Sequence, residues 1–230
     1  LNTGRAGFLD NISDITVTPG VVVDGEPFST DATLTAVEDT ETALSADNFG
    51  YSDTNAPPSA LAAVQITAVP LPGKGTLKLS GTTVTNNEIV AVANIGSLTY
   101  LSATNGNGSP YTTIGIKVQN ELGLWSLPAV MTVNVTPVND PPTSTGGSVI
   151  LRTGTVKTFA VANFQYSDVE GDPLSAIKVT SLSTNGTLSV AEGTEILVAD
   201  IGTLTYTPNP GYTGPDSFKF QVSDGTAFSA

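Results

Sequence analysis

The chain has 230 residues, a mass of 23.4 kDa and a formal net charge of −13, from 8 basic and 21 acidic side chains. This charge repels phosphate backbones and anionic membrane surfaces, so we expect no nucleic-acid partner. The sequence contains no Cys and no His, which excludes Ser-His-Asp and Cys-His catalysis, disulfides and ordinary zinc sites. Carboxylate, amide and carbonyl oxygens remain, and these are the ligands of hard cations such as Ca²⁺. No stretch approaches the roughly 18 consecutive apolar residues of a membrane span, so we expect no direct membrane insertion.

Residues 1–30 are predicted to be the closing strand and linker of a preceding module. Ile15–Pro19 resembles Val133–Pro137, since both place apolar residues at alternate positions before Thr-Pro, and Asp24–Pro27 then takes the linker position. We therefore expect a segment of a longer tandem array. The alternative is that residues 12–18 complete the open sheet of a neighbouring copy by donor-strand exchange.

The rest of the chain is predicted to hold two copies of one module, residues 31–140 and 141–230. Three frames recur in the same order, at offsets of 115, 111 and 106 residues: Asn48–Asp53 and Asn163–Asp168, Gly75–Leu77 and Gly186–Leu188, Ile95–Tyr100 and Ile201–Tyr206. The shrinking offset is what shorter loops in the second copy would produce. An internal repeat of this size indicates modules stacked in tandem.

Each copy contains short runs in which apolar and polar residues alternate, separated by Gly, Asn and Pro. The clearest pair is Ile114–Val118 and Phe218–Val222, and a period of two indicates strands with one buried face. The sequence thus predicts an all-β fold of tandem Greek-key β-sandwiches, of cadherin or immunoglobulin type. We place the boundary in Pro137–Pro142, because prolines cannot donate to a strand ladder. The second copy has no counterpart of Met131–Thr136, so its sheet is expected to be one strand short.

One loop of the second copy places three carboxylates, those of Asp168, Glu170 and Asp172, at alternate positions. In a sandwich, Asp140 in the linker and Asp224 after the penultimate strand are expected at the same pole. Such crowding raises carboxylate pKa values unless a cation is bound, and Ca²⁺ takes about 6 to 8 oxygen ligands. The alternative interpretation is a solvated acidic rim with no bound metal.

Several frames together resemble the cadherin-like tandem repeats of very large bacterial surface adhesins, and also the repeats of chondroitin sulfate proteoglycan ectodomains. The frames are Tyr166–Leu174, Asn185–Leu188, Ile201–Tyr206 and the linker Val138–Pro142. The resemblance covers residues from about 33 to 230. It implies a cadherin-like sandwich, an extracellular location and calcium held between successive modules.

The resemblance also implies ligands, carried over by position. In the second copy and its linker they are Asn139, Asp140, Asp168, Glu170, Asp172 and Asp224. A weaker or empty second site in the first copy would use Asp24, Glu26, Asp53 and Asn55, with help from Glu38 and Asp39. This second site departs from the ligand pattern of the family, because the first copy has Asn120 at the position where the second copy has Asp224.

The sequence therefore predicts a non-enzymatic, calcium-stiffened structural or adhesive repeat segment of a large extracellular surface protein. Its expected partners are neighbouring modules or copies of itself. Two other interpretations remain: a filament subunit that uses residues 12–18 for strand exchange, and a module that recognises a cell-surface glycan or protein. We assign no catalytic residues, since no aromatic cluster indicates a sugar cleft beside the carboxylates.

Overall fold

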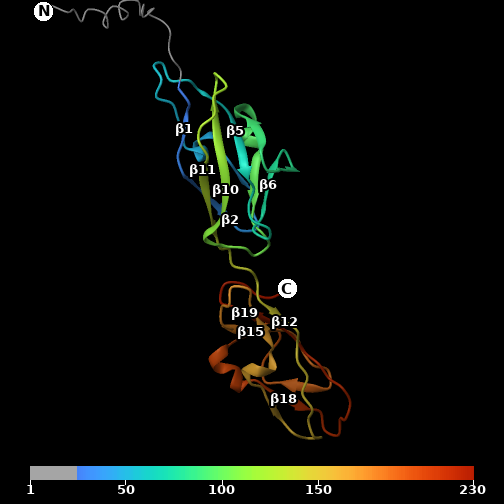
Figure 1. Ribbon diagram of the computed structural model, residues 1–230. Helices are drawn as coiled ribbons and strands as arrows, with labels where there is room; N and C mark the ends of the chain where they lie inside the picture. Colours follow the sequence, from blue (N-terminus) through green and yellow to red (C-terminus); the bar gives the residue numbers. More distant parts are fainter. Residues whose placement is uncertain (1–24) are drawn as a thin grey trace, which may run out of the picture. The chain divides into compact units, whose positions relative to one another are not determined.

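The computed structural model describes residues 25–230 (Figure 1). The chain divides into two compact units between Thr136 and Pro137, a few residues before the boundary after residue 140 that the repeat predicts. We call residues 25–136 the first module and residues 137–230 the second module. The predicted strand of residues 12–18 and the predicted ligand Asp24 lie outside the described residues.

The first module is a β-sandwich. Its strands are β1 (Phe28–Ser29), β2 (Ala32–Val37), β3 (Thr42–Ala43), β4 (Tyr51–Ser52), β5 (Leu61–Ala68), β6 (Thr76–Leu79), β7 (Thr82–Thr83), β8 (Glu88–Ala91), β9 (Leu98–Leu101), β10 (Gly108–Asn120) and β11 (Ala129–Thr136). Two 3₁₀ helices, η1 (Ala46–Phe49) and η2 (Val92–Ser97), connect them. A five-stranded sheet has the order β2-β11-β10-β5-β8, a four-stranded sheet has the order β3-β9-β6-β7, and β1 pairs with β4.

The pairing of β1 changes one predicted boundary. Phe28 and Ser29 pair with Ser52 and Tyr51, so these two residues belong to the first module and not to a preceding linker. The second module repeats this pairing between Thr143–Ser144 and Tyr166–Ser167. The short ribbon is therefore part of each module's own structure.

The long strand β10 organises the five-stranded sheet. As its alternating sequence predicts, Ile114, Ile116 and Val118 are fully buried. It pairs antiparallel with β5 and with β11. The other edge of β11 pairs with β2. This pairing is parallel and has an unbroken register from Met131 opposite Ala32 to Thr136 opposite Val37.

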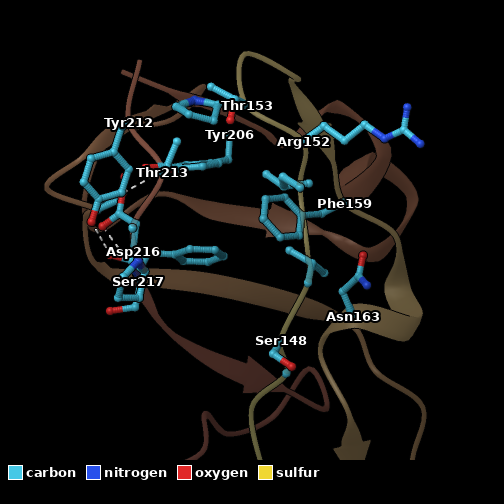
Figure 2. A pocket seen from close by; sticks show the side chains of 18 of the residues that line it. Ser148, Arg152, Thr153, Phe159, Asn163, Tyr206, Tyr212, Thr213, Asp216 and Ser217 are labelled. Atoms are coloured by element: carbon cyan, nitrogen blue, oxygen red, sulfur yellow. Dashed lines mark hydrogen bonds between the residues drawn. The ribbon is translucent and has the colours of Figure 1, made fainter. Parts of the chain in front are cut away.

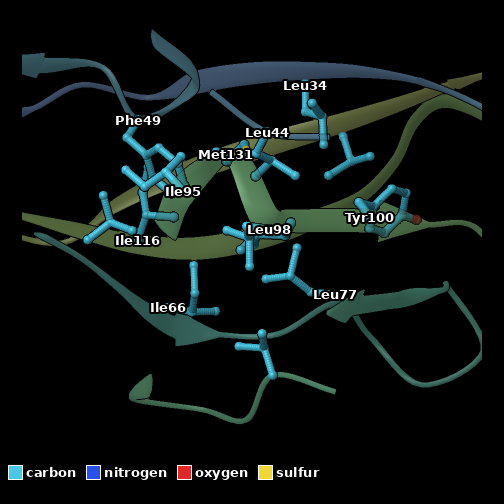
Figure 3. Close-up of a cluster of buried hydrophobic side chains, with 14 of the residues drawn as sticks. Leu34, Leu44, Phe49, Ile66, Leu77, Ile95, Leu98, Tyr100, Ile116 and Met131 are labelled. Atoms are coloured by element: carbon cyan, nitrogen blue, oxygen red, sulfur yellow. The ribbon is translucent and has the colours of Figure 1, made fainter. Parts of the chain in front are cut away.

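The core of the first module lies between its two sheets (Figure 3). Side chains with almost no exposure include Ile66, Leu77, Leu98 and Met131, and each contributes roughly 1.5 to 3 kcal/mol by leaving water. Tyr100 is equally buried, and its hydroxyl donates to the carbonyl oxygen of Lys74 at 2.6 Å. A buried phenol needs such an acceptor.

The second module repeats most of this plan. Its strands are β12 (Thr143–Ser144), β13 (Lys157–Thr158), β14 (Tyr166–Ser167), β15 (Ala176–Ser181), β16 (Gly186–Leu188), β17 (Glu195–Leu197), β18 (Thr205–Pro208) and β19 (Lys219–Ser223), with 3₁₀ helices η3 (Val161–Asn163) and η4 (Val198–Thr203). The sheets have the orders β17-β15-β19 and β13-β18-β16, and β12 pairs with β14. The helical segments among residues 25–230 are 3₁₀ helices of at most 6 residues, and none could cross a bilayer.

Among its described residues the second module lacks counterparts of three strands of the first, β2, β7 and β11. The sequence predicts that one of these, β11, has no counterpart. The absence of a counterpart of β2 accompanies that of β11, because β2 is hydrogen-bonded only to β11. At the offset of 115 residues, the counterpart of β2 is the segment 147–152, which forms no strand.

Candidate metal centre

The loop that follows β14 carries the predicted acidic ligands of the second module. It is closed by Asp168, whose Oδ1 accepts the backbone N–H of Asp172 at 3.0 Å. The turn includes Gly171 at a φ of 81°, a left-handed conformation that side chains disfavour. The Tyr166 hydroxyl donates to the carbonyl oxygen of Asp172 at 2.8 Å. This closure leaves Asp168 and Glu170 half-buried and Asp172 exposed.

The linker lies against this loop and against the loop after β19. The backbone N–H of Asp140 donates to Glu170 Oε2 at 3.4 Å, and the two residues have carboxylate oxygens within 4.8 Å of each other. The side-chain amide of Asn139 donates to Asp224 Oδ2 at 2.9 Å. Four predicted ligands thus form two contacting pairs, each joining the linker to a different loop.

Three buried carboxylate oxygens in this region have no hydrogen-bond partner. They are Asp140 Oδ2, Asp168 Oδ2 and Glu170 Oε1, and no other buried side-chain oxygen or nitrogen in residues 25–230 is left unpaired. A buried carboxylate without a partner is costly. Oxygen atoms from carboxylates and a nearby amide are the donor set that Ca²⁺ prefers. These residues therefore fit a hard divalent cation.

Negative charge concentrates around Tyr166. Burial, together with the charges of Asp168, Asp224 and Asp172, raises the pKa of Tyr166 to about 12. Asp224 is held in its ionised form, because backbone N–H groups of Ala227 and Thr226 and the amide of Asn139 donate to it. These hydrogen bonds, that from Ala227 above all, keep the pKa of Asp224 below its ordinary value.

The first module satisfies the equivalent positions with amides. Asn120 Nδ2 donates to Asp53 Oδ2 at 3.5 Å, and the backbone N–H of Asn55 donates to Asp53 Oδ1 at 2.8 Å. Asn55 Oδ1 in turn accepts the backbone N–H of Gly25 at 2.9 Å. Glu26, another predicted ligand, is exposed. Hydrogen bonds hold this loop together, and the weaker second site that the sequence predicts here stays a prediction.

Glu38 and Asp39 do not support the Asp53 site, and that expectation is wrong. The backbone N–H of Glu38 donates to Thr136 at the end of β11, and its carboxylate accepts the side-chain amide of Asn107 at 2.9 Å. These contacts lie beside the Gly108 end of β10, whereas Asn120 lies at the other end of the strand. The parallel course of β2 along β11 carries Glu38 away from Asp53.

A further acidic residue, Asp216, joins several segments of the second module by hydrogen bonds. It is not among the predicted ligands. Its carboxylate accepts the Tyr206 hydroxyl at 2.7 Å and the backbone N–H groups of Thr184 and Asn185 at 3.2 and 3.0 Å. Burial acts to raise the pKa of Asp216, but these hydrogen bonds outweigh it and keep the pKa below the ordinary value. Two of these partners, Thr184 and Asn185, lie 32 and 31 residues away in another loop, so no local motif marks Asp216.

Asp216 also borders a pocket of the second module, about 470 Å³ in volume (Figure 2). Tyr206 and Tyr212 line it with Asp216, and Ser148 and Arg152 come from the segment that replaces β2. The pocket contains no part of the acidic loop. It is therefore a separate feature from the candidate metal centre.

Comparison with known families supports the fold. Residues 139–230 match the family model described as Bacterial Ig domain. No curated protein matches the chain.

Three solved structures illustrate the likeness to known folds. An endo-fucoidan hydrolase of glycoside hydrolase family 107 is 18% identical over 92% of this chain, with a TM-score of 0.28, and the chain spans only 28% of that protein. Murine CEACAM1b is 12% identical, with 88% of this chain and 94% of that chain covered and a TM-score of 0.24. The titin domains z1z2 in complex with telethonin are 14% identical, with 90% of each chain covered and a TM-score of 0.22. The sheets themselves show an all-β sandwich. By its match to the family model, the second module is similar to bacterial immunoglobulin-like domains.

Proposed function

We propose that the chain is a non-enzymatic structural or adhesive repeat segment of an extracellular surface protein, in which Ca²⁺ stiffens the linker ahead of the second module. The observation that carries this proposal is the set of three unpaired buried oxygens on Asp140, Asp168 and Glu170. An acidic rim of the ordinary kind directs its carboxylates into water. Here one oxygen of each of three carboxylates is buried without a hydrogen-bond partner.

The proposed role of the cation is to fix the linker. Asp140 lies in the linker, and Glu170 lies in a loop of the second module. A cation bound by both would replace their repulsion by coordination and hold the linker on the module. Asn139 and Asp224 add a second attachment of the linker, by a hydrogen bond that is present without metal. The linker would then bend less than its composition alone allows.

Calcium titration by calorimetry, with melting curves in calcium and in chelator, tests this function. We expect saturable binding and a higher melting temperature, because a ligand specific to the folded state stabilises by about 2.7 kcal/mol at 100 times its Kd. The double variant Asp168→Asn/Glu170→Gln should lose both effects. Asp200→Asn/Glu195→Gln, which removes two charges at exposed positions outside the acidic loop, should keep them.

A second readout addresses the linker itself. Limited proteolysis near Asn139 to Pro142 should slow in calcium, and this protection should disappear in the Asp168→Asn/Glu170→Gln variant. If chelator changes neither melting temperature nor cleavage, the carboxylates form a solvated acidic rim and the proposal fails.

A further inference from the structure

The two modules hold the chain segments that enter them by equivalent backbone contacts. In the first module, the backbone N–H of Gly25 donates to Asn55 Oδ1 at 2.9 Å. In the second, the backbone N–H of Asp140 donates to Glu170 Oε2 at 3.4 Å. The two residues of one contact lie 115 positions from those of the other, and the same offset relates β1 to β12. The entering segment is thus attached to the same loop in each module.

The side chains at these equivalent positions differ in charge. Three carboxylates of the second module have no charged equivalent in the first. The equivalents are Gly25 for Asp140, Asn55 for Glu170 and Asn120 for Asp224. The carboxylate of Asp168 is kept, as Asp53. The first module therefore lacks the crowding of negative charge that a cation would relieve at this position.

The side-chain amide of Asn120 makes the contacts that a cation would otherwise make. Asn120 is fully buried, and its Nδ2 donates to Asp53 Oδ2 at 3.5 Å and to the carbonyl oxygen of Gly25 at 3.4 Å. Leu124 fixes this amide, because its backbone N–H donates to Asn120 Oδ1 at 2.9 Å and its carbonyl accepts the Asn120 backbone N–H at 3.1 Å. One amide group thus joins the loop carboxylate to the entering segment.

Asn55 adds a two-point contact with the same segment. Its Oδ1 accepts the backbone N–H of Gly25, and its Nδ2 donates to the carbonyl oxygen of Gly25 at 3.4 Å. The exchange of both backbone hydrogen bonds resembles a pair of residues in adjacent antiparallel strands. The backbone N–H of Asn55 also donates to Asp53 Oδ1 at 2.8 Å, which holds the loop in place. All these donors are amide N–H groups, which are present at any calcium concentration.

We propose that Asn55 and Asn120 form a metal-free clamp on Gly25, so that calcium fixes the segment entering the second module but not the segment entering the first. The contrast between the modules rests on the proposed function, whereas the clamp itself does not. The proposal is the alternative to the weaker calcium site that the sequence predicts in the first module. When calcium falls, such a chain loosens at one entry and keeps the other fixed. The exchange of amides for carboxylates decides which entry responds.

Amide hydrogen exchange, measured by NMR on the full chain, tests the proposal with an internal comparison. The Gly25 amide should exchange at the same slow rate in calcium and in chelator. The Asp140 amide should exchange more slowly in calcium than in chelator. Slowing of Gly25 exchange by calcium would overturn the clamp. An Asp140 amide that ignores calcium would instead overturn the proposed function and the contrast that rests on it, so the two failures are distinguishable.

A single variant tests the contact itself. Asn55→Ala removes the acceptor and the donor that hold Gly25, and it should speed exchange of the Gly25 amide at least about fivefold in both buffers. Asn94→Ala, at an exposed position of η2, is the matched control and should leave this rate unchanged. Equal rates in Asn55→Ala and in the native chain would overturn the clamp.

A graft tests whether the difference in charge is sufficient. The background is the Asp168→Asn/Glu170→Gln chain, which has lost the candidate site of the second module. Adding Gly25→Asp, Asn55→Glu and Asn120→Asp gives the first module the carboxylates of the second. The melting temperature of the graft should rise in calcium, whereas that of the background should not. A graft that is folded in chelator and ignores calcium would overturn the proposal, because the three charges would then not separate the two modules.

Discussion

Asn120, the last residue of β10, and Asp224, the first residue after β19, occupy equivalent positions, but their hydrogen bonds run in opposite directions. Asn120 donates its amide to Asp53, whereas Asp224 accepts the amide of Asn139. One residue neutralises a neighbouring carboxylate, and the other adds a negative charge to three unpaired oxygens nearby. The first module has an amide at this position, and the second has a carboxylate. This exchange is the simplest difference between the hydrogen-bonded loop of the first module and the candidate cation site of the second.

Replacing Glu170 by Gln should have effects of opposite sign with and without calcium. In chelator, the variant should melt higher, because a buried carboxylate oxygen without a partner costs about 1 to 3 kcal/mol. In saturating calcium it should melt lower, since a ligand is lost. Melting curves in both buffers measure this. Glu195→Gln, at an exposed position of β17, is the control, and a shift of equal sign in both buffers would contradict the prediction.

Replacing Tyr166 by Phe should weaken calcium binding without removing a ligand. The change deletes the hydrogen bond from the hydroxyl to Asp172, which holds the acidic loop closed. A loss of about 1 kcal/mol corresponds to roughly a fivefold higher Kd, measured by calorimetry. Tyr51→Phe removes the equivalent hydrogen bond to Ser59 in the first module and should leave the Kd unchanged; equal weakening by both would argue against a local effect.

Replacing Asn120 by Asp should make the first module dependent on a cation. The fully buried Asn120 loses its donor to Asp53, and two carboxylates then face each other. In chelator we expect a loss of about 1 to 3 kcal/mol, recovered in part by calcium. Denaturant unfolding in both buffers measures it. A calcium-insensitive loss would show that the loop cannot accommodate a metal.

Replacing Asp216 by Asn should alter the pH dependence of stability. The folded-state pKa of Asp216 lies below its ordinary value of 3.8, so the folded protein favours the ionised form. The stability this contributes is complete above pH 3.8 and is lost as the pH falls through the lower folded pKa. The variant should therefore be less stable than the native chain at neutral pH, with the difference shrinking toward acid.

Denaturation in chelator at several pH values tests this prediction. Asp200→Asn, which changes an exposed acid in η4, serves as the control for loss of charge. A stability difference between the native chain and Asp216→Asn that stays constant into strong acid would contradict the assigned role of the carboxylate.

The sequence predicts the strands and the acidic loop because both depend on short periods. Ile114–Val118 alternates along one strand, and Asp168, Glu170 and Asp172 alternate along one loop. The carboxylate of Asp172 is exposed, and the loop closes through the backbone N–H and carbonyl groups of this residue, which no sequence period predicts.

Contacts between segments that are distant in the sequence are harder to predict from local sequence patterns. The pairing of Asn139 with Asp224 spans 85 residues and was suggested only by resemblance to known repeats. Asp216 had no local motif, because its partners are backbone groups of another loop. The second module also has no counterpart of β2, and this depends on the parallel pairing of β2 with β11, which no sequence period encodes.

The parallel pairing of β2 with β11 also determines how the first module bears load. The chain enters this ladder at Ala32, opposite Met131, and leaves it at Thr136, opposite Val37. Tension applied through the two ends of the module therefore acts along the strands, in shear, and all the rungs share the force. An antiparallel pair of terminal strands would open from one end, one rung at a time. The first module is thus built to resist extension until the whole ladder yields at once.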